Sequence, residues 1–290
     1  MRPYIEASMN ITCLIISFYT FVPYFLHRKS SNFIGTILFF MATCIYYSIM
    51  HTIYYFSEIL ELYNVHLNLA NYSYRYATWF YVFKVLSTDF IYVSGAALAI
   101  DRFCLMTFPL RYAKWKLSRK LCALGGFACA ATTAVLVGAN ASLPFSSSRS
   151  LSTGTFLANI GTVYDILVFL ELLLHIGFSI QYCRFVRRQK LSAAKAHVLK
   201  ANYITIVLIV SQTIFCFTPK VIHKINGIYF SYQIKWMFTL ATYYTLLFSI
   251  NILLTSSFIA FTLRRKKNHL RKSVSVVKLS IANTQRASAR

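Results

Sequence analysis

Seven long apolar stretches constrain the fold of this chain more than any other feature. They cover roughly residues 9–26, 33–56, 78–100, 121–143, 156–182, 202–223 and 236–262. Each is long enough for a helix to cross a hydrocarbon core about 30 Å thick at about 1.5 Å per residue. A helix also satisfies its own backbone hydrogen bonds in lipid. We therefore predict an all-α membrane protein that folds as a seven-transmembrane helix bundle.

Composition and charge support this prediction and give the bundle an orientation. Of the 290 residues, 57% are hydrophobic and only 13% are charged, which is too apolar for a soluble domain of this length. Most of the 30 Lys and Arg residues fall on the cytoplasmic side if the N-terminus lies outside. The positive-inside rule therefore predicts the N-terminus outside and the C-terminus inside. Since the net charge of +23 then belongs mainly to the inner membrane face, we expect contact with membrane lipids and no nucleic-acid partner.

The loops are too short to hold a separate soluble domain. We expect residues 1–262 to form the seven-transmembrane domain and residues 263–290 to form a basic cytoplasmic tail. The basic run 264–267 fits a short helix lying on anionic lipid, and it fits a plain stop-transfer anchor equally well. Phosphorylation of the Ser and Thr residues farther along would lower the positive charge of the tail and recruit a regulator.

Three Asn-x-Ser/Thr sequons, at Asn10, Asn71 and Asn140, all fall outside in this topology. They are the candidate glycosylation sites. The seven cysteines all lie in the apolar stretches or near the inner face, so we expect no extracellular disulfide.

The third apolar stretch ends in Asp101, Arg102 and Phe103, and Pro109 and Tyr112 follow in the next loop. Taken alone, the Asp-Arg pair can be read as an interfacial salt bridge that meets water and lipid headgroups. The longer spacing is more specific. The run resembles the DRY-x5-PLxY element of rhodopsin-like G-protein-coupled receptors, which closes helix three and opens the second inner loop.

Two further places resemble motifs of the same family. Cys216-Phe217-Thr218-Pro219 resembles the CWxP element of helix six, with Phe217 in the position of its tryptophan, and Asn251 aligns with the asparagine of NPxxY. Pro219 is expected to kink its helix, because proline lacks a backbone donor and clashes with the preceding turn. The alternative is that Pro219 is only a packing kink and Phe217 only a core residue.

Departures from the family pattern point to a divergent branch. No acidic residue occurs between positions 31 and 57, where the family keeps a sodium-binding carboxylate, and the extracellular disulfide is missing. With its small size, its Asp-Arg-Phe variant and its many Tyr and Phe residues, the chain resembles the nematode serpentine-class chemoreceptors. This resemblance implies a plasma-membrane location, including the sensory cilium.

The resemblance also implies a mechanism. A small-molecule ligand would bind from outside, helix six would open around Arg102, and a heterotrimeric G protein would bind there, with a kinase or an arrestin acting on the tail. We expect no enzyme activity, metal or cofactor, because the sequence has no HExxH, no Gly-rich phosphate loop and no cysteine cluster with metal-ligand spacing.

The ligand pocket is expected around the ionisable residues within the spans, since such residues in a membrane usually serve a function. The candidates are Lys84, Asp89, Glu171, Phe217 and Lys220. Lys84 either pairs with an internal acid, for which Glu171 is better placed than Asp89 or Asp165, or it binds an anionic or carbonyl-bearing ligand. Because transporters also use such residues, a transporter or a ligand-gated channel that uses Lys84, Asp89 and Glu171 is the alternative function.

The fourth stretch carries small residues at a spacing of four, Gly126, Ala130, Ala134 and Gly138. Such a stripe lets helix backbones approach closely, either inside the bundle, which we favour, or between two copies of the chain.

Overall fold

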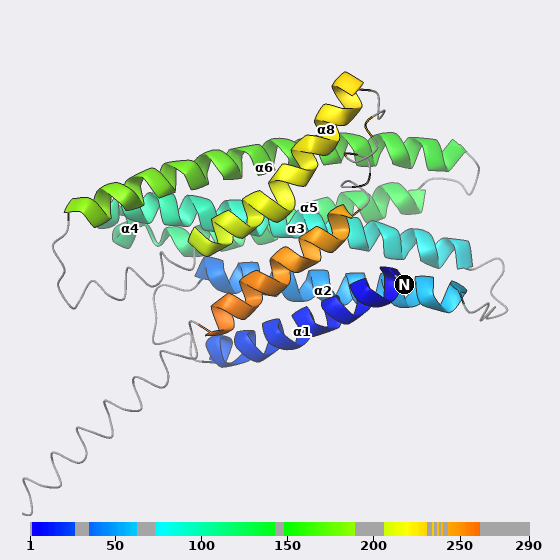
Figure 1. Cartoon of the computed structure of the whole chain (residues 1–290), viewed down its shortest axis with the longest axis horizontal. Helices are drawn as coiled ribbons and strands as arrows, with labels where there is room; N and C mark the ends of the chain where they lie inside the picture. The colour runs from blue at the N-terminus through cyan, green and yellow to red at the C-terminus, as the bar shows by residue number, and fades with distance from the viewer. Residues whose placement is uncertain are drawn as a thin grey trace, which may run out of the picture.

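The computed structural model confirms the seven-helix architecture (Figure 1). It describes residues 2–26, 35–62, 73–142, 148–188, 206–230 and 243–261, together with residues 234, 237 and 239. Within these ranges, seven helices are long and apolar enough to cross a membrane, and no strand occurs.

The first five membrane-spanning helices run longer than the apolar stretches that predicted them. The first five spans lie in α1 (Arg2–Leu26), α2 (Gly35–Leu62), α3 (Ser73–Thr107), α5 (Leu117–Ser142) and α6 (Ser148–Arg188). The sixth span (Ile206–Asn226) passes through the π-helix η3 (Thr213–Phe217) into α8 (Thr218–Phe230). The seventh span is Tyr244–Phe261, and the short helix α4 (Pro109–Trp115) joins α3 to α5.

The α4 connection follows from local sequence. Pro109 is the first residue of α4, where its missing N–H would have no partner within the helix. Lys116 ends α4 in the left-handed region with φ of 48°, and α5 begins at the next residue. The chain therefore reverses direction within a few residues of the end of α3.

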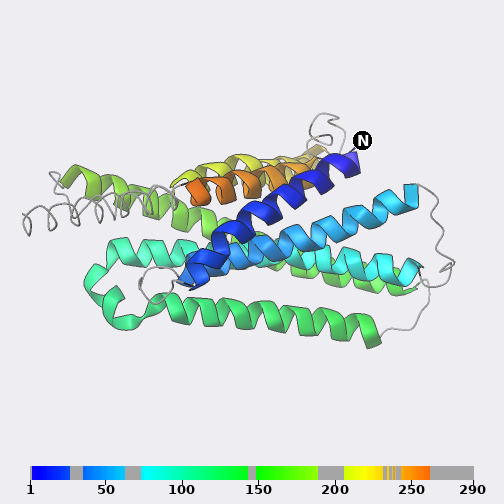
Figure 2. The same cartoon turned by 90° about the horizontal axis from the view of Figure 1, so that it is seen from below.

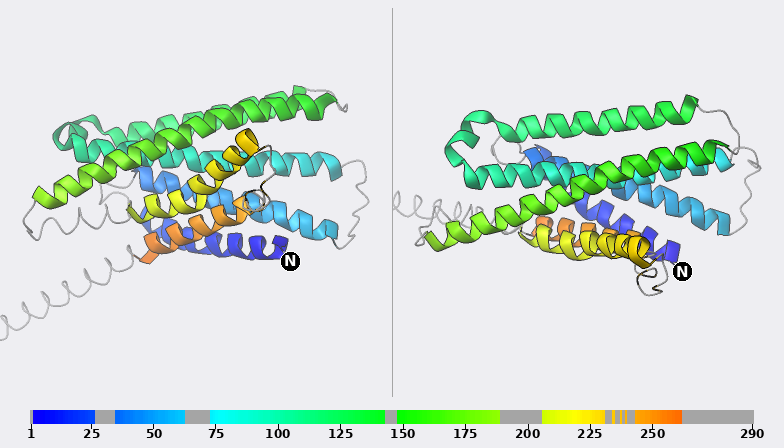
Figure 3. Two further views of the ribbon diagram at one scale, coloured as in Figure 1. Left: turned by 45° about the horizontal axis from the view of Figure 1, so that its top comes forward. Right: turned by 90° about the horizontal axis from the view of Figure 1, so that it is seen from above.

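Helix α3 is the centre of the bundle and packs against α2, α5 and α6. Figures 2 and 3 show α5 at one edge of the bundle, with α1 and the orange seventh span at the opposite edge. We call the two ends of the bundle the Arg102 end and the Lys84 end, after the residues of α3 that lie toward each of them.

Polar side chains cross-link the helices in an otherwise apolar interior. Thr43 on α2 and Ser94 on α3 are 2.7 Å apart through their hydroxyls, and Ser17 on α1 donates to Ser256 on the seventh span at 2.8 Å. Because lipid offers these hydroxyls no partner, such bonds favour one packing of the helices over others.

Helix α6 shows how the sequence sets the buried face of a span. Its buried positions repeat at helical spacing as Tyr164, Val168, Glu171, His175 and Phe178. Large apolar residues cover the outward face, including Val163, Ile166, Phe169 and Leu173. An outward apolar face suits lipid. Glu171 and His175, on the inward face, are therefore candidates for function.

The small-residue stripe of α5 does not pack inside the bundle, contrary to the use that we favoured. A Cβ atom built at Gly126 or at Gly138 meets no described atom within 4 Å. The neighbouring Gly125 is the one that faces inward, where a Cβ would lie 2.7 Å from Phe39 Cε1. The rotation of α5 about its axis therefore turns the stripe outward.

Candidate functional site

The first of two polar clusters lies at the Arg102 end and is built around Asp101. Its carboxylate accepts a hydrogen bond from Thr36 Oγ1 on α2 at 2.8 Å and another from the Tyr112 hydroxyl on α4 at 2.7 Å. Ser118 on α5 accepts the backbone N–H of Thr36 at 3.2 Å. Burial, together with the hydrogen bond to Asp101, raises the pKa of the Tyr112 phenol, so it remains a donor at neutral pH. Asp101 thus joins three helices at this end.

The structure corrects the expectation that the Asp-Arg pair meets water and headgroups. Asp101 and Arg102 are each only 1% exposed. The physical reason is that α3 continues to Thr107, so the pair lies inside the helix and is enclosed by its neighbours. Phe103 packs toward α6, where a Cβ added at Gly177 would lie 3.0 Å from the Phe103 ring.

The sixth span departs from α-helical geometry next to Pro219, where the sequence predicts a kink. The π-helical turn Thr213–Phe217 ends two residues before Pro219, and the Thr218 backbone N–H and hydroxyl both donate to the Thr213 carbonyl. A π-turn re-pairs backbone groups that a proline would leave without partners. Figure 1 shows this span crossing the face of the bundle beside the seventh span.

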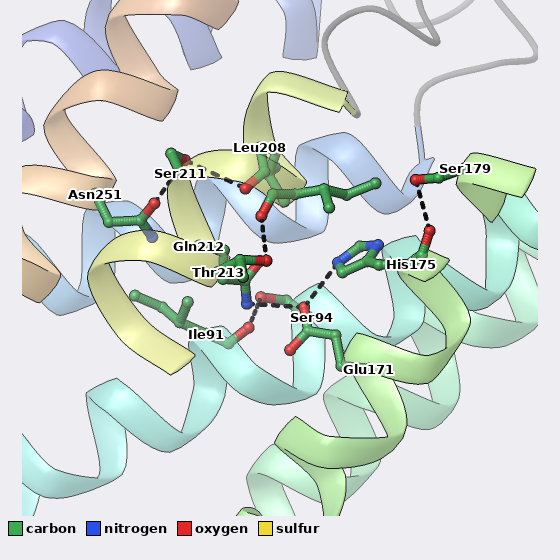
Figure 4. Close-up of polar contacts among 11 residues, drawn as sticks. Ile91, Ser94, Glu171, His175, Ser179, Leu208, Ser211, Gln212, Thr213 and Asn251 are labelled. Atoms are coloured by element: carbon green, nitrogen blue, oxygen red, sulfur yellow. Dashed lines mark hydrogen bonds and ion pairs between the residues drawn. The ribbon is translucent and has the colours of Figure 1, made fainter. Parts of the chain in front are cut away.

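Asn251 links the sixth and seventh spans (Figure 4). Its side chain is buried, and its Oδ1 lies 2.7 Å from the donating hydroxyl of Ser211. The Ser211 oxygen is also 3.3 Å from the Thr255 hydroxyl. The two spans therefore share a hydrogen-bond network at Ser211, two residues before the π-helix.

Removing the Ser211 hydroxyl should loosen this network. We expect Ser211→Ala to lower the free energy of unfolding by about 1 to 2 kcal/mol, because the buried Asn251 oxygen loses its donor. Thermal unfolding of the purified protein in detergent measures the change. The matched control is Ser8→Ala, whose exposed hydroxyl donates only to the Ile5 carbonyl, and its unfolding midpoint should hardly move. Equal midpoints for the two variants would contradict the assigned role of Ser211.

The second polar cluster lies near the middle of the bundle and consists of Glu171, His175 and Gln212 (Figure 4). Gln212 Nε2 on the sixth span donates to Glu171 Oε1 at 2.9 Å, and His175 Nε2 lies 3.5 Å from the same oxygen. The side chains are 2%, 3% and 8% exposed for Glu171, His175 and Gln212. Gly95 makes room for the carboxylate, since a Cβ there would lie 2.2 Å from Glu171 Oε1.

A small cavity adjoins this second cluster, which we call the central cavity. It lies between α3, α6 and the sixth span and has room for about one water molecule. Among the residues that line it are Tyr92, Glu171, His175, Gln212, Cys216 and Phe217. Phe217, expected in the ligand pocket, therefore lies beside Glu171. Sequence reasoning missed His175 and Gln212, although His175 follows Glu171 by one helical turn on the same buried face.

The predicted pairing of Lys84 with Glu171 is wrong. Lys84 Nζ lies over the rings of Tyr54 and Tyr55, 3.7 and 4.6 Å from their centroids. Glu171 packs against Gly95, eleven residues farther along α3, which at about 1.5 Å per residue places it roughly 16 Å from the level of Lys84. The two residues are therefore at different depths of the bundle.

The other two acids proposed for Lys84 lie close to Lys220 instead. Lys220 Nζ is 2.5 Å from Asp165 Oδ1, and Lys224 binds the second oxygen of the same carboxylate. Asp89 is 8% exposed and interacts electrostatically with both Lys220 and Asp165. Lys220 also lies 4.7 Å from the centroid of the Tyr92 ring, so this charged group adjoins the central cavity.

One glycosylation candidate is wrong in this fold. Asn10 is fully buried and donates to the Glu6 carbonyl at 2.7 Å, so its amide offers no accessible acceptor for a glycan. Asn140 lies within α5. Asn71 and the tail 263–290 lie outside the described residues.

The described residues contain no group of three or more His, Cys, Asp or Glu side chains that could hold a metal ion. Comparison of the sequence with protein-family models and with curated proteins gives no match. The geometry of the two polar clusters is therefore the main basis for a functional proposal.

Proposed function

We propose that this chain is a rhodopsin-like G-protein-coupled receptor of the chemosensory kind. In this proposal it lies in the plasma membrane, including that of a sensory cilium, with its N-terminus outside and Arg102 facing the cytoplasm. The observation that carries the proposal is the burial of Asp101 and Arg102 at one end of a seven-helix bundle, where α2 and α4 hold Asp101.

The proposed mechanism is a shift between two packings of the helices. In the closed packing described above, Arg102 is covered. A small extracellular ligand that binds an open packing more tightly would shift the population toward it. The π-turn beside Pro219 supplies a place where the sixth span can bend. Phe217, the last residue of that turn, lines the central cavity and would respond to a ligand there. Opening would expose Arg102 to a heterotrimeric G protein, and a kinase or an arrestin would then act on the basic tail.

One observation favours a second candidate, a transporter or a ligand-gated channel. Glu171 and Asp89 are buried ionisable residues within the spans, which is typical of substrate and ion pathways. Lys84 does not join them, because it lies over tyrosine rings nearer its own end. Current or substrate flux in cells that lack G proteins would support this candidate over the receptor.

The test is ligand-stimulated nucleotide exchange with Arg102→Ala. Expressed protein is first exposed to a panel of small volatile and water-soluble metabolites, and the strongest response is used. Losing a buried charged contact costs about 2 to 5 kcal/mol, so we expect stimulated exchange to fall at least about 30-fold while surface expression persists. The matched control is Arg111→Ala, an exposed position on α4, which should retain most of the response. Undiminished exchange in Arg102→Ala would overturn the proposal.

A further inference from the structure

The central cavity presents hydrogen-bond acceptors without matching donors. Glu171 Oε2 and Gln212 Oε1 are buried and accept no hydrogen bond from the described residues. The ring nitrogens of His175 form no hydrogen bond either, although Nε2 lies 3.5 Å from Glu171 Oε1. Gln212 uses its amide group to donate to the other Glu171 oxygen. When its imidazole is neutral, His175 offers one acceptor nitrogen, and three acceptors of the cluster then remain to be satisfied. Buried acceptors of this kind are costly unless something donates to them.

The basic group beside the Glu171 carboxylate is His175, whose Nε2 lies 3.5 Å from Oε1 and which balances the carboxylate only when it is protonated. Within the described part of the chain, Glu171 forms no ion pair with a lysine or an arginine. Lys220, on the Tyr92 side of the cavity, is bound to Asp165 at 2.5 Å. A carboxylate at this depth of a membrane protein is stabilised by a positive partner.

Size and lining restrict what that partner can be. Since the cavity has room for about one water molecule, it fits a water-sized ion. The rings of Tyr92 and Phe217 line it, and aromatic faces attract cations. Ammonium is close to water in size and donates four hydrogen bonds, whereas sodium and potassium supply charge without directional donors. The three acceptors can take three of the four N–H groups of ammonium.

We propose that the central cavity is a binding site for an ammonium-type cation, either ammonium itself or the charged head of methylamine. Glu171 Oε2, Gln212 Oε1 and a His175 nitrogen accept its N–H groups. The bound cation joins α6 to the sixth span one residue before the π-helix Thr213–Phe217. The site does not require coupling to a G protein, so the two proposals can fail separately.

Binding is tested on the purified full-length chain in nanodiscs by thermal unfolding at pH 7 and constant ionic strength. Ammonium chloride and methylammonium chloride should raise the unfolding midpoint saturably, by about 5 °C at high occupancy. Sodium, potassium and tetramethylammonium chlorides should produce little change. No ammonium-specific shift would overturn the proposal, and an equal shift with potassium would overturn the assigned ligand class.

Two variants locate the effect. Glu171→Gln keeps the shape of the side chain and removes its charge, so the ammonium-dependent shift should disappear. Glu58→Gln is the matched control, because Glu58 lies in α2, which contributes no residue to the cavity lining, and this variant should leave the shift intact. If Glu171→Gln does not fold, Gln212→Leu should reduce ammonium affinity at least about tenfold through the loss of one acceptor. Retention of the full shift in whichever of these two cavity variants folds would overturn the proposal.

Discussion

Replacing Gly95 with alanine is expected to lower the free energy of unfolding by about 2 to 3 kcal/mol, although the change adds a single methyl group. The new Cβ would lie 2.2 Å from Glu171 Oε1 and 3.0 Å from Glu171 Cδ. The carboxylate must therefore move, and it would lose the hydrogen bond that Gln212 donates at 2.9 Å. Hydrogen bonds to charged groups contribute about 1.5 to 3 kcal/mol, which sets the size of the effect. Thermal and denaturant unfolding in detergent measure it.

Gly126→Ala provides the matched control for this change. Gly126 lies in α5 and has no described atom within 4 Å of the position of a new Cβ. Because alanine is the better helix former by about 1 kcal/mol, this variant should be neutral or slightly more stable. Equal stabilities of Gly95→Ala and Gly126→Ala would mean that the Glu171 carboxylate does not rest against α3. The closeness of α3 and α6 at this level would then be in doubt.

Hydropathy alone predicted the seven helices, because an apolar span in lipid must satisfy its own backbone hydrogen bonds. It did not predict where the helices end. Helix α3 continues to Thr107 and α6 begins at Ser148, beyond the apolar stretches at both places. Hydropathy reports contact with lipid, whereas helix ends depend on local signals such as Pro109 and on packing beyond the membrane. The error had a consequence, since it placed Asp101 and Arg102 in water when they are buried.

The two clusters were predictable to different degrees. Motif spacing identified Asp101 and Tyr112, which α3 and α4 bring together over a short stretch of chain. Thr36 could not be found in this way, because its contact with Asp101 depends on how α2 is rotated against α3. The pairing of Lys84 with Glu171 was wrong for a related reason. A sequence gives the position of a residue along its own helix but not the relative offset of two helices.

Neutralising the buried carboxylate at the Arg102 end should have the largest effect on the fold. We expect Asp101→Asn to lower the free energy of unfolding by about 3 to 5 kcal/mol, since it leaves Arg102 buried beside a neutral residue. The asparagine would also place an NH2 group where the carboxylate accepts from Thr36 and Tyr112. The control is Asp165→Asn, a partly exposed carboxylate that binds Lys220 and Lys224, where a smaller loss of about 1 kcal/mol is expected.

The single variants Thr36→Val and Tyr112→Phe separate the charge of Asp101 from its hydrogen bonds. Each removes one donor to Asp101 and leaves the carboxylate in place, so each should cost less than Asp101→Asn. Their effects should also be non-additive, because both hydroxyls act on one group.

If Arg102 controls G-protein binding, the Asp101→Asn variant should also raise ligand-independent nucleotide exchange, as the Arg102 end opens more often. An Asp101→Asn protein as stable as Asp165→Asn would show that Arg102 does not depend on this carboxylate, and the closed state proposed for the receptor would lose its main restraint.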